Sequence, residues 1–518
     1  MKFSYLLKEC TPLWERTFIS ASDSEKDPEI SSIHFRAQQV KPGGLFIAVK
    51  GFKSDGHDYI DEALKKGAVA IVAEKRLEFP EIRTVQVKNT RKAMACISSV
   101  FYHNPSEKMI LIGVTGTNGK TTITWILESI LNAAGYVPGV IGTINWRYKD
   151  HIFDNLNTTP ESMELQKILF QMKQAGVTHV ILEVSSHGID LGRINNISFD
   201  IGIFTNLSQD HLDYHKNMKQ YFLCKKRFFT KYLVKGTKKS FARAIINIDD
   251  QKGKLLLGSV LSKTITTSTK NNTADIKSYD VQDDILGLSG RIRIKEKNFS
   301  FQSELTGKFN LENILSATGA CHVLGISIEN IKKGIKRCKS IPGRLERIKN
   351  ISNKFIFVDY AHTPNALEAV LKTLKKRALA RIILIFGCGG DRDRAKRSIM
   401  GKIAFKYSDI AIITSDNPRT EDPNVIINDI LKDLKDSLAK YRIKNFKNEF
   451  IKKGIFIEPD RKKALKTAIK ISLPNDIVIA AGKGHETEQI LKNNTIYFDD
   501  RKVLENAVVN YELDTGIK

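Results

Sequence analysis

The segment Gly113–Trp125, with the sequence GVTGTNGKTTITW, has the residue types of a phosphate-binding loop. Its core, Gly119–Thr121, lacks the earlier glycine of the common motif. An apolar run, Met109–Gly116, precedes the core, and apolar residues at helical spacing follow it. A strand, a glycine turn and a helix N-terminus together aim backbone N–H groups at an anion. The sequence therefore predicts a nucleotide-phosphate site with Lys120 on the terminal phosphates and Thr121 on Mg²⁺; a flexible turn before an ordinary helix is the alternative.

Two further polar clusters follow apolar segments of the chain. Leu182–Arg193, LEVSSHGIDLGR, combines a carboxylate, hydroxyl groups, a histidine and an arginine, and Thr205–His215, TNLSQDHLDYH, follows the next apolar run. Sheets of parallel strands bind their ligands at the carboxyl ends of the strands. Glu183 and His211 are therefore candidate groups for Mg²⁺ near the phosphates. A purely structural role is the alternative for either residue taken singly.

The pattern of strands and helices predicts an α/β protein with more than one sheet. Apolar runs alternate with helical stretches around the phosphate loop and again after residue 350, which is typical of a parallel, doubly wound sheet. Between Lys263 and Leu305 apolar and polar residues alternate, which indicates antiparallel strands. At ~150 residues per domain, the chain length predicts about three domains.

The composition allows sizeable cores and gives the protein a strongly basic balance. The chain has 518 residues, 42% of them hydrophobic, and a formal net charge of +25. Such a charge raises the possibility of nucleic-acid binding. The lysines are spread along the chain, however, and aromatic residues do not interleave with them as a base-stacking surface requires. We therefore predict a solvated basic surface that attracts polyanionic small substrates, and no nucleic-acid partner.

The N-terminus and the cysteines indicate a cytoplasmic protein. Lys8 and Glu9 interrupt the only apolar stretch near the start of the chain, which argues against a signal peptide, and no apolar run is long enough to span a membrane. The six cysteines are scattered without CxxC pairs, which argues against zinc and against a disulfide framework. We therefore expect a reducing compartment and no membrane insertion.

Motifs from one end of the chain to the other resemble those of the Mur ligases of peptidoglycan synthesis. TGTNGKTT, Thr115–Thr122, is similar to the family's own phosphate loop, which explains the unusual glycine spacing. The other motifs follow in the family's order: VKPGGLFIAVKGFKSDGHDYI, NTTPES, EVSSHGIDLGR, TNLSQDHLDYH, GKFNLENILSA, PGRLERI, VDYAHTP, GCGGDRDRAKR, SDNPRTEDP and GKGHE. The resemblance is greatest to the members that add the third residue of the peptide.

This resemblance implies an ATP-dependent ligase of three α/β domains. They are an N-terminal α/β domain (1–107) for the UDP end of the substrate, a central P-loop ATPase-like domain (108–341) with a mostly parallel sheet and a small antiparallel sheet, and a C-terminal Rossmann-like domain (342–518) for the amino acid. The implied reaction adds meso-2,6-diaminopimelate to UDP-N-acetylmuramoyl-L-alanyl-D-glutamate through an acyl phosphate, and the enzyme is expected to be a monomer. Positioning and charge neutralisation dominate such phosphoryl transfers.

The resemblance also assigns residues to the ATP site. Lys120, Lys225 and His211 would be catalytic, with Lys225 carbamylated, and Thr121, Glu183, His211 and Lys225 would support Mg²⁺. The implied ATP contacts are Gly116, Thr117, Asn118, Gly119, Lys120, Thr121, Thr122, Asn310, Arg344 and Asp359. Without the resemblance, Lys225 would be taken for a surface lysine beside Lys226.

The two other substrates have implied positions as well. The UDP-linked dipeptide would contact Phe52, Lys53, Ser54, Asn157, Thr158, Thr159, Ser185 and Arg193; Ala37 stands where the family usually has a serine near the uridine. The amino acid would contact Arg392, Asp416, Asn417, Pro418, Arg419, Gly482 and Glu486. Arg419 can hold a distal carboxylate in a bidentate fork, although a helix-start arginine paired with Glu421 or Asp422 is the structural alternative. Folylpolyglutamate synthetase is one rival function, but it does not account for the DNPR motif at Asp416–Arg419 or for an N-terminal uridine domain. A nucleic-acid-dependent P-loop ATPase is the other, and it would require ATP turnover stimulated by polynucleotide.

Overall fold

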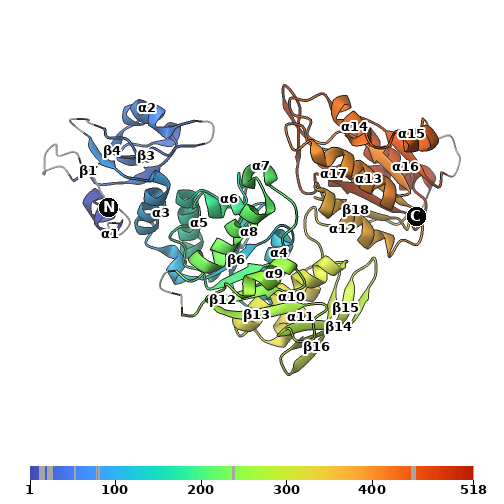
Figure 1. Ribbon diagram of the computed structural model, residues 1–518, viewed down its shortest axis with the longest axis horizontal. Helices are drawn as coiled ribbons and strands as arrows, with labels where there is room; N and C mark the ends of the chain where they lie inside the picture. Colours follow the sequence, from blue (N-terminus) through green and yellow to red (C-terminus); the bar gives the residue numbers. More distant parts are fainter. Residues whose placement is uncertain are drawn as a thin grey trace.

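The computed structural model describes residues 1–10, 18–19, 27–51, 54–77, 79, 82–235, 238, 240–444 and 451–516. Within them, the strands form three larger sheets and one two-stranded sheet. Figure 1 shows the three sheets, with their helices, as separate bodies: blue at the N-terminal end, green to yellow in the centre, and orange to red at the C-terminal end. No helix of the described part of the chain is long and apolar enough to cross a membrane.

The N-terminal sheet has the strand order β1-β5-β4-β3-β2 and is parallel except for the β1–β5 pair. Its elements are α1 (Phe3–Cys10), β1 (Phe18–Ile19), β2 (Ser32–His34), η2 (Ala37–Gln39), β3 (Gly44–Ile47), η3 (Gly56–Tyr59), α2 (Ile60–Lys65), β4 (Ala68–Ala73), β5 (Arg83–Gln86), α3 (Thr90–Phe101) and η4 (Pro105–Lys108). Leu45 and Phe46 are consecutive in β3 and lie in different apolar clusters, because successive side chains of a strand point to opposite faces.

The central sheet begins with β6 (Ile110–Thr115), the strand that leads into the phosphate loop. The elements up to the sheet's middle are α4 (Lys120–Ala133), β7 (Pro138–Ile141), β8 (Trp146–Tyr148), β9 (His151–Phe153), α5 (Ser162–Gln174), β10 (His179–Glu183), α6 (Ser186–Asp190), β11 (Ile201–Phe204), α7 (Leu212–His215), α8 (Met218–Arg227) and the π-helical turn η5 (Phe228–Tyr232). The remaining ones are β12 (Arg243–Asn247), α9 (Gln251–Leu257), β13 (Lys263–Ser268), β14 (Ile276–Asp283), β15 (Leu288–Ile294), β16 (Lys297–Ser303), α10 (Lys308–Val323) and α11 (Ile328–Arg337).

The order of the central strands, β16-β15-β14-β13-β12-β11-β6-β10-β7-β8-β9, puts β6 between β10 and β11. All pairs from β7 to β14 are parallel, so the carboxyl ends of β6, β10 and β11 meet at one edge. Leu111 packs on one face of the sheet and Ile112 on the other, so β6 is covered by helices on both sides. Such burial explains the nearly continuous apolar run of the strand.

The prediction of antiparallel strands between Lys263 and Leu305 is right for β14–β16 and wrong for β13. β13 pairs in parallel with both β12 and β14, and the antiparallel strands continue the large sheet. Polar residues fill much of β13, as in KTITTS, and three of its six side chains are only partly buried, so the strand does not read as a continuous apolar run. Alternation reports that one face is less buried and does not report the direction of the neighbouring strand.

The C-terminal sheet has the order β17-β18-β23-β19-β20-β22-β21 and is parallel except for the β17–β18 pair. The sheet and its helices are made of β17 (Glu346–Ile348), β18 (Phe355–Asp359), α12 (Pro364–Lys375), β19 (Ile382–Phe386), α13 (Ala395–Tyr407), β20 (Ile410–Ile413), α14 (Pro423–Leu431), α15 (Lys435–Tyr441), β21 (Arg442–Ile443), β22 (Gly454–Ile457), α16 (Arg461–Ile471), β23 (Ile477–Ala481) and α17 (Asp500–Thr515). β24 (Glu488–Ile490) and β25 (Thr495–Tyr497) form the separate two-stranded antiparallel sheet. This is the doubly wound arrangement that the sequence predicts for the C-terminal region.

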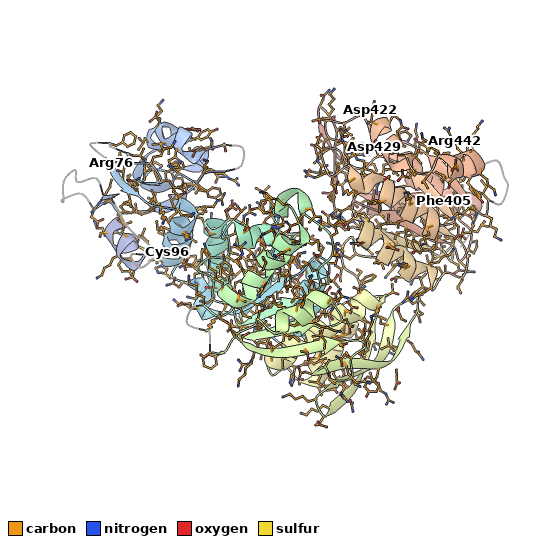
Figure 2. The ribbon with its side chains drawn as sticks, in the orientation of Figure 1. Arg76, Cys96, Phe405, Asp422, Asp429 and Arg442 are labelled. Carbon is orange, nitrogen blue, oxygen red and sulfur yellow. A yellow bond between two sulfur atoms is a disulfide. The ribbon has the colours of Figure 1, made fainter. Side chains whose placement is uncertain are left out.

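A disulfide joins Cys10 and Cys96, and this finding corrects the expectation that the cysteines do not pair. Cys10 ends α1, and Cys96, labelled in Figure 2, lies on α3. The two helices pack against each other, which brings the Cα atoms to 5.9 Å although 86 positions separate the residues in sequence. The spacing carries no local signature, so tertiary packing alone produces this pair. The other four cysteines are free and buried.

Candidate active site

The predicted phosphate loop joins the carboxyl end of β6 to the N-terminus of α4. Gly116 has φ 148° and Gly119 has φ 89°, backbone conformations that glycine adopts without strain. Gly119 is the N-cap residue of α4 and has no side-chain cap, so the first N–H groups of the helix remain available to an anion. Lys120 Nζ donates to the carbonyl oxygens of Gly116 at 3.0 Å and Thr117 at 2.8 Å. The loop thus has the geometry of an anion site.

Gly116 has a packing requirement that gives a testable prediction. A Cβ at this position would overlap Thr205 Oγ1, whereas a Cβ on Gly135, which also has positive φ, would meet nothing within 4 Å. Both Gly→Ala changes force a side chain into a strained backbone region, at a cost of roughly 1–3 kcal/mol. We expect Gly116→Ala to lower the free energy of unfolding more than Gly135→Ala does, as measured by urea denaturation. Equal losses would show that the loop relaxes around the new methyl group.

Glu183 ends β10 beside the loop and is almost fully buried at 1% exposure. Its Oε1 accepts from the backbone N of Thr143 at 3.1 Å, and its Oε2 accepts from Thr143 Oγ1 at 2.9 Å. A Cβ on Gly142 would overlap this carboxylate. The side chains of Thr121 and Thr122, in the first turn of α4, are also buried. The carboxylate is therefore held in one orientation at the edge where the phosphate loop lies.

His211 lies after β11 in the left-handed conformation, with φ 53°. Its Nε2 is 3.5 Å from Asp210 Oδ2, and its ring centroid is 5.1 Å from that of His187. Burial lowers the pKa of His211 to about 4, although Asp210 acts in the opposite direction. The imidazole is therefore neutral near pH 7 and has a ring nitrogen able to bind a cation.

Lys225, on α8, is 1% exposed and donates from Nζ to the carbonyl oxygen of Gly116 at 2.9 Å. Lys120 donates to the same oxygen, so two amino groups share one acceptor. Burial, and secondly the charge of Lys120, lowers the pKa of Lys225 well below its usual value. Burial also lowers the pKa of Lys120, while Glu183 and Asp210 raise it. Lys225 is therefore the amine more readily found in its neutral form.

The residues expected to contact the UDP-linked dipeptide come together in part. Thr159 Oγ1 donates to Glu183 O at 2.7 Å and lies 3.1 Å from Ser185 Oγ, and Arg193 donates to Thr159 O at 2.9 Å. Thr158 contacts Thr143, and Asn157 is half-buried beside it. Ser54 is exposed on the N-terminal domain. Phe52 and Lys53 lie outside the described residues.

Arg193 has a further partner that the sequence did not indicate. Its guanidinium forms an ion pair with Glu161 at 2.9 Å, and Glu161 also accepts from Arg91 of α3 at 2.9 Å. Glu161 caps α5 through a reciprocal pair of hydrogen bonds with Glu164. This carboxylate therefore links the central domain, including Arg193, to the N-terminal domain.

The expected adenosine and phosphate contacts lie on two different domains. Asn310 is buried on α10 and donates to Thr306 O at 2.8 Å. Asp359 ends β18 and accepts from the backbone N of Leu345 at 2.7 Å and of Ala361 at 2.8 Å; burial raises its pKa. The Arg344 guanidinium lies 4.6 Å from the centroid of the Tyr360 ring. Arg344 and Asp359 therefore belong to one hydrogen-bonded corner of the C-terminal domain.

Arg344 is joined tightly to the turn that contains the GKGHE motif. A Cβ on Gly343 would overlap the backbone of Gly484 and His485, and both glycines have positive φ. The backbone N of Gly343 also donates to Glu346 Oε2 at 2.7 Å. Only glycine at these positions lets the two chain segments approach so closely.

A cleft of about 630 Å³ lies between the central and C-terminal domains. Both sides contribute residues that the sequence predicts for catalysis or amino-acid binding: His211 from the central domain, and Arg392, Asp416, Asn417, Arg419, Gly482 and Glu486 from the C-terminal domain. Pro418 belongs to the same loop but does not line the cleft. The structure thus brings the predicted amino-acid residues to one wall, facing the histidine of the other domain.

The C-terminal side of the cleft, lined by Arg392, Asp416, Asn417, Arg419, Gly482 and Glu486, is called the amino-acid wall. Hydrogen bonds among its own polar groups hold it in place. Asn417 donates from Nδ2 to Glu486 Oε2 at 2.9 Å, and Arg419, with φ 52°, donates to Gly390 O at 2.9 Å. Lys483, fully buried, donates to Glu486 Oε2 at 3.1 Å and to Asn417 Oδ1 at 3.2 Å. The Glu421 carboxylate forms ion pairs with Arg397 and Arg394, so its charge is already balanced without Arg419.

Several cleft residues were not predicted. Tyr360, His362, Lys396, His187 and Asp210 line the cleft, although no chemical role was assigned to them from sequence. Their motifs, VDYAHTP, TNLSQDHLDYH, EVSSHGIDLGR and GCGGDRDRAKR, lie at the carboxyl edges of the two sheets. Position after a buried parallel strand was therefore the available signal. Lys483 carried the same signal, because it lies in GKGHE directly after β23, but nothing in the sequence showed that its side chain is buried.

Fold and site together define a three-domain α/β protein with a phosphate-binding loop beside a cleft for a second ligand. Models of three family domains match the chain: "Mur ligase family, catalytic domain" at residues 29–102, "Mur ligase middle domain" at 114–321, and "Mur ligase, glutamate ligase domain" at 343–484. The chain belongs to the Mur ligase family.

Similar proteins cover nearly the whole chain. The UDP-N-acetylmuramoyl-L-alanyl-D-glutamate–2,6-diaminopimelate ligase of Geobacter metallireducens is 41% identical over 92% of this chain and 93% of its own length. The enzyme of the same name from Alkaliphilus oremlandii is 42% identical over 92% and 94%. A solved structure of a ligase of this name has a TM-score of 0.66 at 29% identity and covers 95% of this chain and 97% of its own. MurF ligase of Thermotoga maritima in complex with ADP shares the fold, with a TM-score of 0.63 at 20% identity over 95% and 100%.

Proposed function

We propose that this protein is the ATP-dependent ligase that joins meso-2,6-diaminopimelate to UDP-N-acetylmuramoyl-L-alanyl-D-glutamate in peptidoglycan precursor synthesis. The observation that carries the proposal is the interdomain cleft, which is lined on one side by His211 and on the other by Asn417, Arg419 and Glu486. Relatives with the name of this enzyme match more than nine-tenths of the chain at about 40% identity. ATP is the co-substrate that the phosphate loop and the family support.

The proposed reaction has two steps. The terminal carboxylate of the dipeptide attacks the γ-phosphorus of ATP, which forms an acyl phosphate and releases ADP. The amine of diaminopimelate then attacks the acyl carbon, phosphate leaves with the bonding electron pair, and the amine loses a proton. Lys120 and the N–H groups of α4 neutralise the phosphate charge, and the cleft holds the amine close to the acyl carbon.

The residues at the edge of the central sheet fit Mg²⁺. Glu183 is a buried carboxylate with a fixed orientation, Thr121 has a buried hydroxyl group, and His211 is neutral near pH 7. Mg²⁺ prefers oxygen ligands and keeps several from water and phosphate, so a small number of protein ligands suffices. Bound there, the ion would neutralise developing charge on the phosphoryl oxygens.

Carbamylation of Lys225 fits the same corner. A neutral amine reacts with CO₂ to form a carbamate and one proton, and burial together with Lys120 favours the neutral form of Lys225. Unmodified, the two lysines compete for the Gly116 carbonyl; as a carbamate, Lys225 would attract Lys120 and present oxygen atoms to a cation. The reaction therefore changes a repulsive contact into an attractive one.

The same proposal extends to organisation and location. We propose domains 1–107, 108–341 and 342–518, each of which contains one of the three larger sheets. Because one chain supplies both walls of the cleft, a monomer suffices for activity. Use of ATP and a UDP-linked precursor supports a cytoplasmic location.

The decisive experiment offers the enzyme a choice of amino acids. The full chain is incubated with ATP, Mg²⁺, UDP-N-acetylmuramoyl-L-alanyl-D-glutamate and a mixture of meso-diaminopimelate, L-lysine and other amino acids, and the product is identified by mass spectrometry. We expect the product mass that contains diaminopimelate. A product that contains another amino acid would contradict the proposed amino-acid substrate. ATP hydrolysis that is stimulated by polynucleotide, without a ligated product, would contradict the proposed function.

Arg419 is expected to select diaminopimelate over lysine. A guanidinium forms a charge-assisted fork with the distal carboxylate, worth ~1.5–3 kcal/mol, and L-lysine lacks this group and leaves the arginine unpaired. We therefore expect wild-type kcat/KM to favour meso-diaminopimelate by about a hundredfold or more, ~2.7 kcal/mol. Arg419→Ala loses most of this activity without becoming a good lysine ligase, because Glu486 and Arg392 remain.

Arg394→Ala is the matched control for this arginine. Arg394 lies in the next loop, is largely exposed and pairs with Glu421. We expect its kinetics with diaminopimelate to stay close to those of the wild type. The proposed role of Arg419 is contradicted if the wild-type enzyme adds L-lysine equally fast, or if Arg419→Ala has the same kinetics as the control. The DNPR motif would then only precede a helix and would not select the amino acid.

A further inference from the structure

Behind the amino-acid wall lies a fully buried ion pair between Arg461 and Asp500. Arg461 is the first residue of α16 and Asp500 the first residue of α17, and the two are 1% and 0% exposed. Arg461 Nε donates to Asp500 Oδ1 at 2.8 Å, and its NH2 group donates to Oδ2 at 2.6 Å. The planar guanidinium thus meets the carboxylate in the bidentate geometry that arginine allows.

The remaining donors of Arg461 bind two backbone carbonyls. One N–H group donates to Ser415 O at 3.3 Å, and another donates to Ala481 O at 3.1 Å. Ser415 directly precedes Asp416–Arg419, the segment with Asn417 and Arg419. Ala481 ends β23 and directly precedes Gly482–Glu486, the segment with Glu486. One buried side chain therefore binds the base of both segments that form the amino-acid wall.

The contacts between the two segments require a fixed distance between them. A Cβ on Gly482 would lie 2.6 Å from Asp416 Oδ2, and the Asn417 amide bonds Glu486 across the gap. β20 and β23 are not neighbours in the sheet, since β19 lies between them. No ladder hydrogen bond therefore joins their ends, and the guanidinium supplies a direct link.

We infer that Arg461, held by Asp500, is a positioning residue that fixes the spacing of the two amino-acid-binding segments. It does not touch the substrate; it holds Asn417, Arg419 and Glu486 at the separation that one diaminopimelate molecule spans. A misplacement of such groups by about 1 Å can cost on the order of a hundredfold in rate. The inference rests on the proposed function for its kinetic consequence, and its structural content stands without it.

The same domain contains a matched control pair. Arg381 and Asp476 are also buried and bidentate, with the NH2 group of Arg381 2.6 Å from Asp476 Oδ2 and its Nε 3.4 Å from Oδ1, and Arg381 likewise donates to two carbonyls, those of Ile451 and Ile471. They precede β19 and β23, so they lie at the amino-terminal edge of the sheet, away from the cleft. The two pairs therefore share their chemistry and differ in position.

The test replaces each pair by apolar residues, because removal of one partner alone would leave a buried charge. Arg461→Met/Asp500→Leu is compared with Arg381→Met/Asp476→Leu by steady-state kinetics and by amide hydrogen exchange. We expect the first variant to raise KM for meso-diaminopimelate by about tenfold or more, with KM for ATP unchanged. We also expect faster exchange in both 416–419 and 482–486. The second variant changes neither quantity.

The inference is overturned if amide exchange in 416–419 and 482–486 is unchanged in the first variant. It is also overturned if the control variant shows an equal increase in exchange in these segments. Exchange needs no substrate, so a wild-type protein that fails to ligate diaminopimelate refutes the proposed function and leaves exchange to decide the positioning role. If the double variant does not fold, Arg461→Lys replaces it. Lysine retains the charge beside Asp500 but lacks the planar fork, so the same faster exchange is expected, and wild-type exchange in this variant overturns the inference.

Discussion

Lys120→Ala is expected to abolish ligation while the protein remains folded. The Lys120 amino group lies at the N-terminus of α4, where it would neutralise the transferred phosphoryl group, and no other lysine of the phosphate loop can replace it. Loss of a cation that stabilises phosphoryl transfer reduces turnover by about a thousandfold or more. The measurement is ADP release together with product formation at saturating ATP.

The fold is expected to survive because the Lys120 amino group binds carbonyl oxygens of its own loop, those of Gly116 and Thr117. Gly116 O keeps a donor in Lys225 when Lys120 is removed. Lys332→Ala, an exposed lysine of α11 paired with Glu329, is the control for loss of one positive charge in the same domain. Near-wild-type turnover of Lys120→Ala would refute the assignment of the phosphate loop.

Lys225→Ala is expected to be nearly inactive because it removes the carbamate. Lys225→Glu recovers activity only if its shorter carboxylate reaches the cation, since glutamate ends closer to the backbone than a carbamylated lysine. Short-chain carboxylic acids are expected to restore part of the activity of the alanine variant by occupying the vacated space. Carbon-13-labelled bicarbonate is expected to give a carbamate signal in the wild type by NMR and none in Lys225→Ala.

Lys226→Ala is the control for this prediction, because Lys226 is the next residue of α8 and lies outside the buried corner. We expect it to retain both activity and the carbamate signal. Full activity of Lys225→Ala in bicarbonate-free buffer would exclude a catalytic role for the carbamate.

Local sequence was sufficient for the parts of the site that are contiguous. The phosphate loop could be predicted because strand, glycines, lysine and helix follow one another within Gly113–Trp125. The DNPR and GKGHE motifs likewise follow buried strands, and the parallel sheet brings strand ends to one edge. The doubly wound fold of the C-terminal region followed from the same alternation of strand and helix.

Features produced by tertiary contact could not be predicted in this way. Lys225 and Gly116 are 109 positions apart, and nothing in FLCKKRFF distinguishes the buried lysine from its half-buried neighbour Lys226. Arg461 lies in a lysine-rich helix, and its partner Asp500 begins a different helix. The Cys10–Cys96 pair and the parallel pairing of β13 depend in the same way on which elements become neighbours.

The close contact between Gly343 and the Gly484–His485 backbone has a consequence for the timing of ATP use. Because this contact packs the segment before Arg344 against the turn that ends in Glu486, we expect the arginine and the amino-acid wall to move together. If Arg344 contacts the phosphates of ATP, as the family resemblance implies, it arrives only together with the bound nucleophile. The activated acyl group would then form only when an amine is ready to capture it, and little ATP would be lost to water.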